Sequence, residues 1–244
     1  MSAGFVMMAA GALGLLAFLC WATYRSGLLL RAVDIPFNVL TSPPEVAARL
    51  ALIAVCVGLG LVSGLPWTQL GWASTDPVLD VALGLAVGVL IQAPLNLIAS
   101  WAIRAEVLAR WRSRLYDPRV VLLILPRNRR QWVTVPLAFV SAVVLEELLF
   151  RSLLVGGLST VAPALPLAAA CALVFGLVHW PQGVLGVVAT AVAGFLLAVL
   201  FLARGSLLPP LVAHYAVNIL QIVLAARQRE SLTNLAKARA PSPG

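Results

Sequence analysis

The sequence predicts an all-α fold, a polytopic bundle of about seven transmembrane helices. Of the 244 residues, 61% are hydrophobic and only 11% are charged, with a mean hydropathy of +1.00, values typical of membrane proteins. Because backbone groups cannot bond to water in the hydrocarbon, and these runs lack the alternation of barrel strands, we expect helices. A span needs about 20 predominantly apolar residues. Seven windows meet this need: 3–24, 50–70, 78–103, 132–158, 162–180, 183–203 and 206–226.

Positive charge lies almost entirely between these spans, which favours membrane topology over nucleic-acid binding as the reason for the formal charge of +8. Fifteen of the 17 basic residues fall on one predicted side of the membrane. Of the other two, Arg204 lies on the opposite side and Arg151 lies inside a span. The positive-inside rule therefore places the N-terminus outside and the C-terminus in the cytoplasm. The fifteen are Arg25, Arg31, Arg49, Arg104, Arg110, Arg112, Arg114, Arg119, Arg127, Arg129, Arg130, Arg227, Arg229, Lys237 and Arg239.

The first apolar run is predicted to be a retained helix rather than a cleaved signal peptide. It has no basic segment before it, it is longer than a signal-peptide apolar region, and Arg25 follows it as a cytoplasmic anchor would. The three cysteines, Cys20, Cys56 and Cys171, are unclustered and lie in apolar runs, which indicates packing rather than a disulfide framework or a thiolate metal site.

Three regions follow from these patterns: peripheral helices with a basic interfacial segment over 1–131, a membrane core of four helices over 132–226, and a cytoplasmic tail over 227–244 that we expect to be disordered. Within and just before the basic segment, tryptophan and leucine recur at helical spacing, which predicts an amphipathic stretch in the membrane interface that ends at Asp117-Pro118. The recurring residues are Trp101, Leu108, Trp111 and Leu115.

Prolines inside the predicted spans remove helical hydrogen bonds, so Pro94 and Pro136 are candidate kinks beside a cavity. The pair Pro209-Pro210 has two explanations, a bend before the polar residues of the last span or the start of its helix.

Charged residues within the fourth span are the strongest functional signal. Glu146, Glu147 and Arg151 fall within six positions, and each charge costs roughly 2.5 to 3.5 kcal/mol at mid-membrane. Glu147 and Arg151 are one helical turn apart, so we expect a structural ion pair. Because Glu146 points about 100 degrees away from Glu147, we expect it to have a different partner. Without a local cation it is the candidate general base.

Both histidines of the chain also lie in spans, His179 in the fifth and His214 in the seventh, where Asn218 follows one turn later. Pairs four residues apart on three helices could converge on one cavity, in which one histidine helps Glu146 hold a water while the other, with the amide, donates to an oxyanion. The alternative is interhelical hydrogen bonding alone, and Phe175 is assigned to packing. His179 falls near the cytoplasmic end of its predicted span, so either that helix sits deeper or its limits are displaced.

Three segments carry a family resemblance: Glu-Glu-Leu-Leu-Phe-Arg at 146–151, Phe-Gly-Leu-Val-His at 175–179 and His-Tyr-Ala-Val-Asn at 214–218. In order, they resemble the EExxxR, FxxxH and HxxxN motifs of the CAAX prenyl protease and bacteriocin-processing family of intramembrane endopeptidases, over residues 132–226. The resemblance implies that the four helices over 132–226 are the catalytic core and that Glu146 and His179 activate the nucleophilic water. It also implies that His214 and Asn218 form an oxyanion hole, supported by Glu147 and Arg151. Ser152 stands where the family usually has glycine.

No cofactor is expected. Glu146, His179 and His214 are residue types that can hold zinc, but no HExxH helix is present, and a carboxylate with an imidazole can activate water without a metal. The expected partners are membrane lipid and a membrane-anchored or lipidated peptide, with prenylated CAAX-type peptides as the candidate class. Abundant Ala, Arg and Gly with a single lysine suggest a GC-rich genome, and hence a bacterial plasma membrane.

Two other functions are compatible with the same residues. One is a transporter in which Glu146 and the histidines relay protons, although no inverted repeat is visible. The other is a catalytically idle immunity or scaffold protein that acts by binding a partner.

Overall fold

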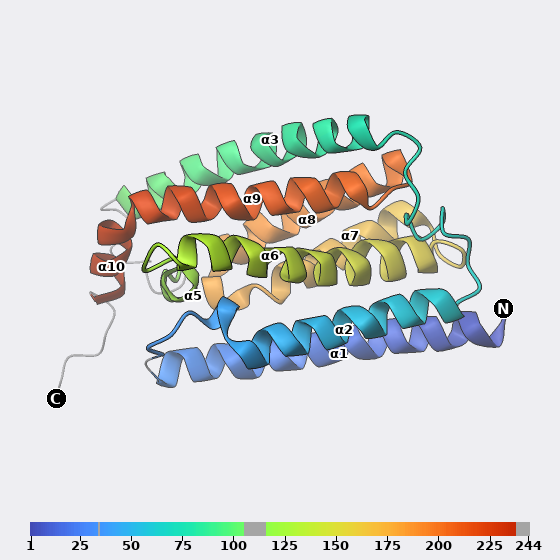
Figure 1. The fold of residues 1–244 in the computed structure, drawn as a ribbon, viewed down its shortest axis with the longest axis horizontal. Coiled ribbons are helices and arrows are strands. Elements are labelled where there is room, and N and C mark those ends of the chain that lie inside the picture. Colours follow the sequence, from blue (N-terminus) through green and yellow to red (C-terminus); the bar gives the residue numbers. More distant parts are fainter. Residues whose placement is uncertain (34, 105–115, 238–244) are drawn as a thin grey trace.

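The computed structural model describes residues 1–33, 35–104 and 116–237. Long helices run side by side, roughly antiparallel, along the length of the molecule, and shorter ones gather near one end (Figure 1). The long helices are α1 (Ala3–Ala32), α2 (Pro43–Val62), α3 (Pro77–Arg104), α6 (Gln131–Glu147) with its π-helical continuation η3 (Leu148–Gly157), α7 (Ala164–Leu177), α8 (Val184–Arg204) and α9 (Leu208–Arg227). The short ones are η1 (Val39–Thr41), α5 (Arg119–Ile124), η4 (Trp180–Gln182) and α10 (Arg229–Lys237).

The predicted all-α membrane bundle is confirmed, and the described residues form no strand. Six of the seven predicted spans are helices long and apolar enough to cross a membrane. The remaining one, α7, has 14 residues and is about 21 Å long, short of the roughly 30 Å hydrocarbon core. Helix α1 begins at one end of the bundle and α10 lies at the other (Figure 1), as an odd number of crossings requires.

The second span begins earlier than predicted, at Pro43 instead of residue 50, because two prolines and Glu45 provide a favourable first turn. Arg49 therefore lies inside α2 and is only 5% exposed, so its placement in a cytoplasmic loop was wrong. Its guanidinium donates to the carbonyl of Ala138 at 2.9 Å and to the hydroxyl of Ser141 at 3.3 Å, both on α6, and to the carbonyl of Leu40. Arg49 thus joins α2, η1 and α6.

The last span begins with Pro209 and Pro210 in the first turn of α9, which decides between the two explanations in favour of a helix start. Both α3 and α6 continue through their internal prolines.

The segment after α9 is more ordered than predicted. Helix α10 covers residues 229–237, and its Leu232 is 1% exposed within an apolar cluster formed with α5, α6 and α9. The expectation of disorder was therefore wrong for these residues. The apolar side chain of Leu232 packs on the ends of α5, α6 and α9 and holds α10 against the bundle. Residues 238–244 lie outside the described part of the chain.

Most of the predicted interfacial stretch, residues 105–115, also lies outside the described part. The turn at its end is confirmed, because the carboxylate of Asp117 accepts from the backbone N–H of Arg119, where α5 begins.

Two close contacts fix the outer elements on the core. Helix α3 packs chiefly on α9 through Gly84 and Gly88, where a Cβ on Gly88 would lie 2.8 Å from the carbonyl oxygen of Ala213. The loop after α2 contacts η3 at the end of the bundle where α1 begins. There, Nε1 of Trp72 donates to the hydroxyl of Ser152 at 2.8 Å. The serine that replaces the family's usual glycine therefore serves as a buried acceptor.

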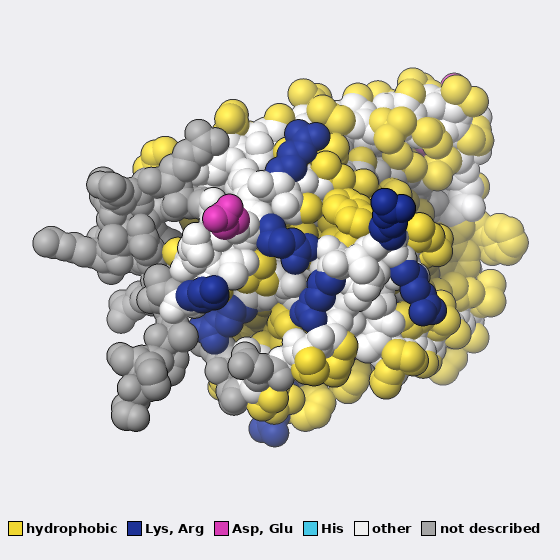
Figure 2. Space-filling model, turned by 60° about the vertical axis from the view of Figure 1, so that its left-hand side comes forward, with side chains coloured by type: hydrophobic (Ala, Val, Ile, Leu, Met, Phe, Trp, Pro, Cys, Tyr) yellow, Lys and Arg dark blue, Asp and Glu magenta, His cyan; other side chains and the backbone are white. Residues whose placement is uncertain are grey.

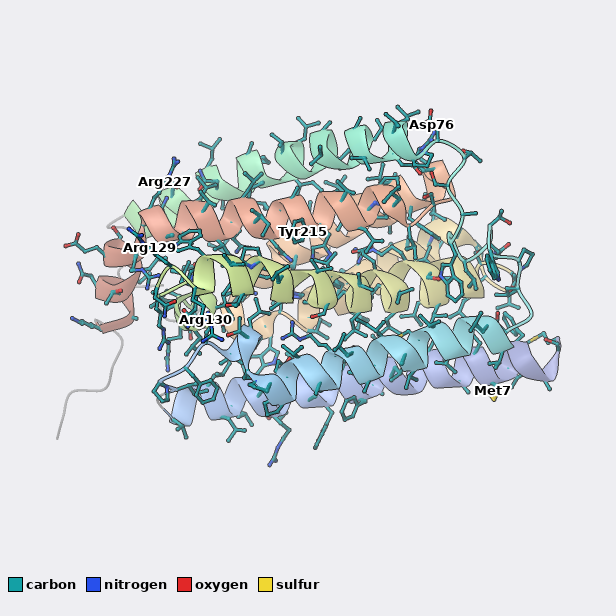
Figure 3. All side chains as sticks on the ribbon, in the orientation of Figure 1. Met7, Asp76, Arg129, Arg130, Tyr215 and Arg227 are labelled. Carbon is teal, nitrogen blue, oxygen red and sulfur yellow. The ribbon has the colours of Figure 1, made fainter. Side chains whose placement is uncertain are left out.

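Basic side chains concentrate at one end of the bundle. Figure 2 looks toward this end and shows dark blue Lys and Arg side chains spread over a face with little acidic colour. Arg129, Arg130 and Arg227 are exposed at this end, while Asp76 marks the other (Figure 3). The charge asymmetry read from the sequence is thus an asymmetry between the two ends of the fold.

Candidate active site

A buried ion pair forms the base of the site. Nη1 of Arg151 donates to Oε1 of Glu147 at 2.9 Å, and the two side chains are 2% and 0% exposed. Nη2 of Arg151 donates to the carbonyl oxygen of Gly194 on α8 at 2.9 Å, at a glycine whose missing Cβ would lie 2.9 Å from the ring of Phe175. The predicted pair is therefore present, and it connects η3 to α8.

His214 lies between the two glutamates. Its Nδ1 is 2.7 Å from Oε1 of Glu147, and its Nε2 is 3.5 Å from Oε2 of Glu146. The expectation that the two glutamates address different partners was wrong. Although their backbone directions differ by about 100 degrees, the two long side chains reach different nitrogens of one imidazole. Oε2 of Glu147 has no hydrogen-bond partner among the described groups.

His179 lies outside the helix that precedes it. Helix α7 ends at Leu177, three residues before the predicted limit, and His179 begins the turn that leads into η4. Displaced helix limits are thus the explanation that the structure supports. Nδ1 of His179 lies 2.7 Å from the carbonyl oxygen of Phe175. Because a carbonyl oxygen only accepts, Nδ1 carries the hydrogen, and Nε2 is free to accept a proton when the ring is neutral.

Phe175 lies between the two histidines. Its ring centroid is 4.9 Å from that of His179 and 5.9 Å from that of His214, so the two imidazoles are no farther apart than the sum of these distances. The guanidinium carbon of Arg151 is 4.9 Å from the Phe175 centroid, within cation–π range. Sequence reasoning assigned Phe175 to packing alone. Its spacing of four from His179 was the available signal that it packs against the site.

The predicted site residues are brought together to different degrees. Glu146, Glu147, Arg151 and His214 form one connected cluster, and His179 joins it through Phe175, with no direct contact to Glu146 among the interactions described. Asn218 lies one turn after His214 and makes no hydrogen bond within the described part of the chain.

Burial divides the cluster into two layers. Glu147, Arg151 and His214 are buried, whereas Glu146, with 30% of its side chain exposed, and the half-buried His179 and Asn218 are accessible. Among described residues, no group of three or more His, Cys, Asp or Glu side chains is arranged to hold a metal ion. The arrangement provides one accessible carboxylate and one accessible imidazole beside a buried charged network.

Fold and site together define a class: a multi-pass helical membrane protein whose titratable side chains meet inside the bundle. Residues 128–220 match a family model described as type II CAAX prenyl endopeptidase Rce1-like. The match covers all three motifs and confirms the family resemblance drawn from them. The comparisons found no curated protein and no solved structure that matches. The matched family is a protease family, so the match supports a peptide hydrolase. Helices α1, α2 and α3 lie outside the matched region.

Proposed function

We propose that the protein is an intramembrane endopeptidase that hydrolyses a peptide bond of a membrane-associated substrate. The observation that carries the proposal is the placement of Glu146, whose accessible carboxylate lies against His214 while the buried Glu147–Arg151 pair holds the other side of that ring. A transporter or a scaffold needs no such division between an accessible carboxylate and a buried support.

In the proposed reaction, Glu146 and Nε2 of His179 hold the attacking water and one of them takes its proton. The water oxygen bonds to the carbonyl carbon of the substrate, and the carbonyl electrons move onto its oxygen. That oxyanion is stabilised by hydrogen bonds from His214 and Asn218. Return of the proton to the amide nitrogen then breaks the C–N bond and leaves a carboxylate and an amine. We propose that this water is activated without a metal ion.

The role of His214 depends on its two neighbours. If Nδ1–H is donated to Glu147, Nε2 must also carry a hydrogen in order to donate to an oxyanion. The carboxylates of Glu147 and Glu146 lie 2.7 and 3.5 Å from these two nitrogens, and each can accept from an N–H group. Glu147 thus supports the proposed oxyanion hole as well as pairing with Arg151.

A groove of about 510 Å³ supports a lipidated substrate. It lies between α2 and α6, has a mostly apolar lining, and includes Val144, two residues before Glu146. An acyl or prenyl chain in this groove would bring an attached peptide close to the site, so we propose CAAX-type prenylated peptides as the substrate class.

We further propose that residues 132–226 form the catalytic core, that the arginine-rich end faces the cytoplasm, and that the protein resides in a bacterial plasma membrane. The basis is the positive-inside rule applied to the end shown in Figure 2, together with the composition of the chain.

Cleavage by the purified full-length protein in lipid nanodiscs tests the proposal. The substrates are a farnesylated CAAX peptide, its unprenylated form and a transmembrane peptide, with products identified by mass spectrometry. Glu146→Gln and His179→Ala should each lower kcat roughly 100- to 10,000-fold, the usual contribution of a general base. Glu230→Gln, at an exposed glutamate on α10, is the matched control and should cleave normally.

Cleavage by Glu146→Gln at the wild-type rate would refute the assignment. Proton-driven flux into vesicles without cleavage would favour the transporter, and full cellular function of Glu146→Gln would favour the scaffold.

A further inference from the structure

Helix α1 lies outside the matched region, yet it contacts the segment that follows His179. Gly27 is buried against Trp180 of η4, and a Cβ at Gly27 would lie 2.5 Å from Cζ2 of Trp180 and 3.1 Å from Cγ of Pro181. One turn earlier on α1, the ring of Tyr24 lies 5.8 Å from that of Trp180, centroid to centroid. The indole therefore packs on α1 at a point where only a glycine leaves room.

The turn from His179 to Gly183 connects α7 to α8 and is not part of either helix. Its internal hydrogen bonds are short-range: the N–H of Gln182 donates to the carbonyl of His179, and that of Gly183 to the carbonyl of Trp180, each at 3.0 Å. Gly183 has a φ of 87°, a conformation that favours glycine. The position of the turn therefore depends on its neighbours as well as on helical geometry.

Two neighbours hold this turn from different parts of the chain. The backbone N–H of Asp117 donates to the carbonyl of Gln182 at 2.9 Å, and α1 supports Trp180 and Pro181 through Gly27. Among described residues, the only side-chain hydrogen bond of His179 itself is the one to the carbonyl of Phe175. A shift of Trp180, the next residue in the chain, would thus carry His179 with it.

We propose that Gly27 and Trp180 form a positioning contact through which α1 holds the imidazole of His179 in place. The proposal rests on the proposed function in one respect, namely that His179 acts on the water. It assigns a role in the reaction to a helix that the family match does not include. A side chain at residue 27 would push the indole away, displace the turn and move Nε2 of His179 from its working position.

The chain provides a matched control on the same helix. Nothing lies within 4 Å of a Cβ built on Gly14, which is exposed on α1. Gly27→Leu and Gly14→Leu therefore make the same change in sequence, helix and hydrophobicity, and only the first should displace Trp180.

Histidine ¹⁵N NMR of the full-length protein in nanodiscs gives a readout independent of activity, because the chain has only two histidines. In Gly27→Leu, the Nδ1–H signal of His179 should shift or lose its hydrogen-bonded character, while the signals of His214 should stay unchanged. Gly14→Leu should leave both unchanged. In cleavage assays, Gly27→Leu should lower kcat roughly 10- to 100-fold, since a misplacement of about 1 Å can cost about 100-fold.

Rescue separates positioning from folding. In the double variant Gly27→Leu with Trp180→Phe, the smaller ring makes room for the leucine and still packs on α1, so the His179 signal and kcat should recover toward wild type. If Gly27→Leu does not fold, Gly27→Ala, with a single methyl group against the indole, replaces it. A His179 signal identical to that of Gly14→Leu would overturn the positioning contact. If the NMR change occurs but the wild type cleaves none of the peptides, the positioning contact stands and the proposed function fails.

Discussion

The fourth span, α6 with η3, and the three spans before it, α1, α2 and α3, are all long and apolar, but they differ in how much of each helix is buried in the protein. Half of the most apolar window of α6 and η3 is buried, against 17% for α1, 17% for α2 and 22% for α3. The fourth span buries Glu147 and Arg151, whereas the outer helices present large apolar side chains on the outside. The charged side chains of the candidate site thus lie on the fourth span, and the outer helices affect the site through their contacts with the elements that carry it.

Two of those contacts depend on a glycine of the outer helix. Gly27 of α1 lies against Trp180, and Gly88 of α3 lies against Ala213, the residue before His214. Other contacts are made by side chains: Arg49 of α2 donates hydrogen bonds to α6, Asp80 of α3 pairs with Arg204 of α8, and Met8 of α1 is buried in the apolar core. The comparison implies that substitutions in the core remove charge partners, while those at the outer helices displace elements that carry the site.

The largest effect is expected for Arg151→Met. It leaves the buried carboxylate of Glu147 without its arginine partner and removes the side-chain donor of the Gly194 carbonyl, and breaking a buried pair costs about 3–5 kcal/mol. Thermal unfolding in detergent should show a large drop in stability, and cleavage should be lost. Arg25→Met, at an exposed arginine of α1, should stay within roughly 0.5 kcal/mol of wild type.

The double variant Glu147→Gln with Arg151→Met sharpens this result. Replacing both charges by neutral groups should return much of the stability, because a buried pair is often close to neutral overall. Activity should not return, because His214 loses its carboxylate partner. Equal stability of Arg151→Met and Arg25→Met would show that the core charges are not held as the structure has them.

A smaller effect is expected for Gly88→Leu at the contact between α3 and α9. Its Cβ would lie 2.8 Å from the carbonyl oxygen of Ala213, and overpacking of this kind typically costs 1–3 kcal/mol. Because α9 carries His214 and Asn218, kcat should also fall. Gly58→Leu on α2, where nothing lies within 4 Å of the Cβ, is the control and should change neither unfolding temperature nor kcat. Parallel behaviour of the two variants would contradict close packing of α3 on α9.

The fold class and the ion pair could be predicted from the sequence. The physical reason is the free-energy cost of placing charged side chains in the hydrocarbon of a membrane. Charges inside an apolar run are so unfavourable that Glu146, Glu147 and Arg151 stand out in the sequence. Residues four apart on one helix lie on the same face, so the pairing of Glu147 with Arg151 follows from their spacing alone. His179, His214 and Asn218 are polar residues in apolar runs and could be found in the same way.

Tertiary relations were not accessible to the same reasoning. Arg49 is separated from Ala138 by 89 positions, and His214 from Glu147 by 67, so no local pattern shows that either pair is in contact. Hydropathy alone does not distinguish an arginine in the first turns of a helix from one in the preceding loop. The predicted second span therefore began at residue 50, after Arg49, instead of at Pro43. The packing of Trp180 on Gly27 is likewise a relation between distant segments.

The smallest effect is expected for Leu232→Ala at the boundary between core and tail. Leu232 is buried with Val135 and Phe139 of α6 and with Ile222 of α9, and α10 is a nine-residue helix. A leucine-to-alanine change in a core costs 2–5 kcal/mol, but here the loss should appear as local undocking of α10 because so short a helix opens on its own. Trypsin cleavage after Arg229 should therefore accelerate, with peptide hydrolysis changed by less than about twofold. Leu235→Ala, at a half-buried position of the same helix, should accelerate trypsin cleavage less. A large loss of hydrolysis on undocking would instead make α10 part of the core, since it would show that α6 and α9 need this cover to hold Glu146 and His214.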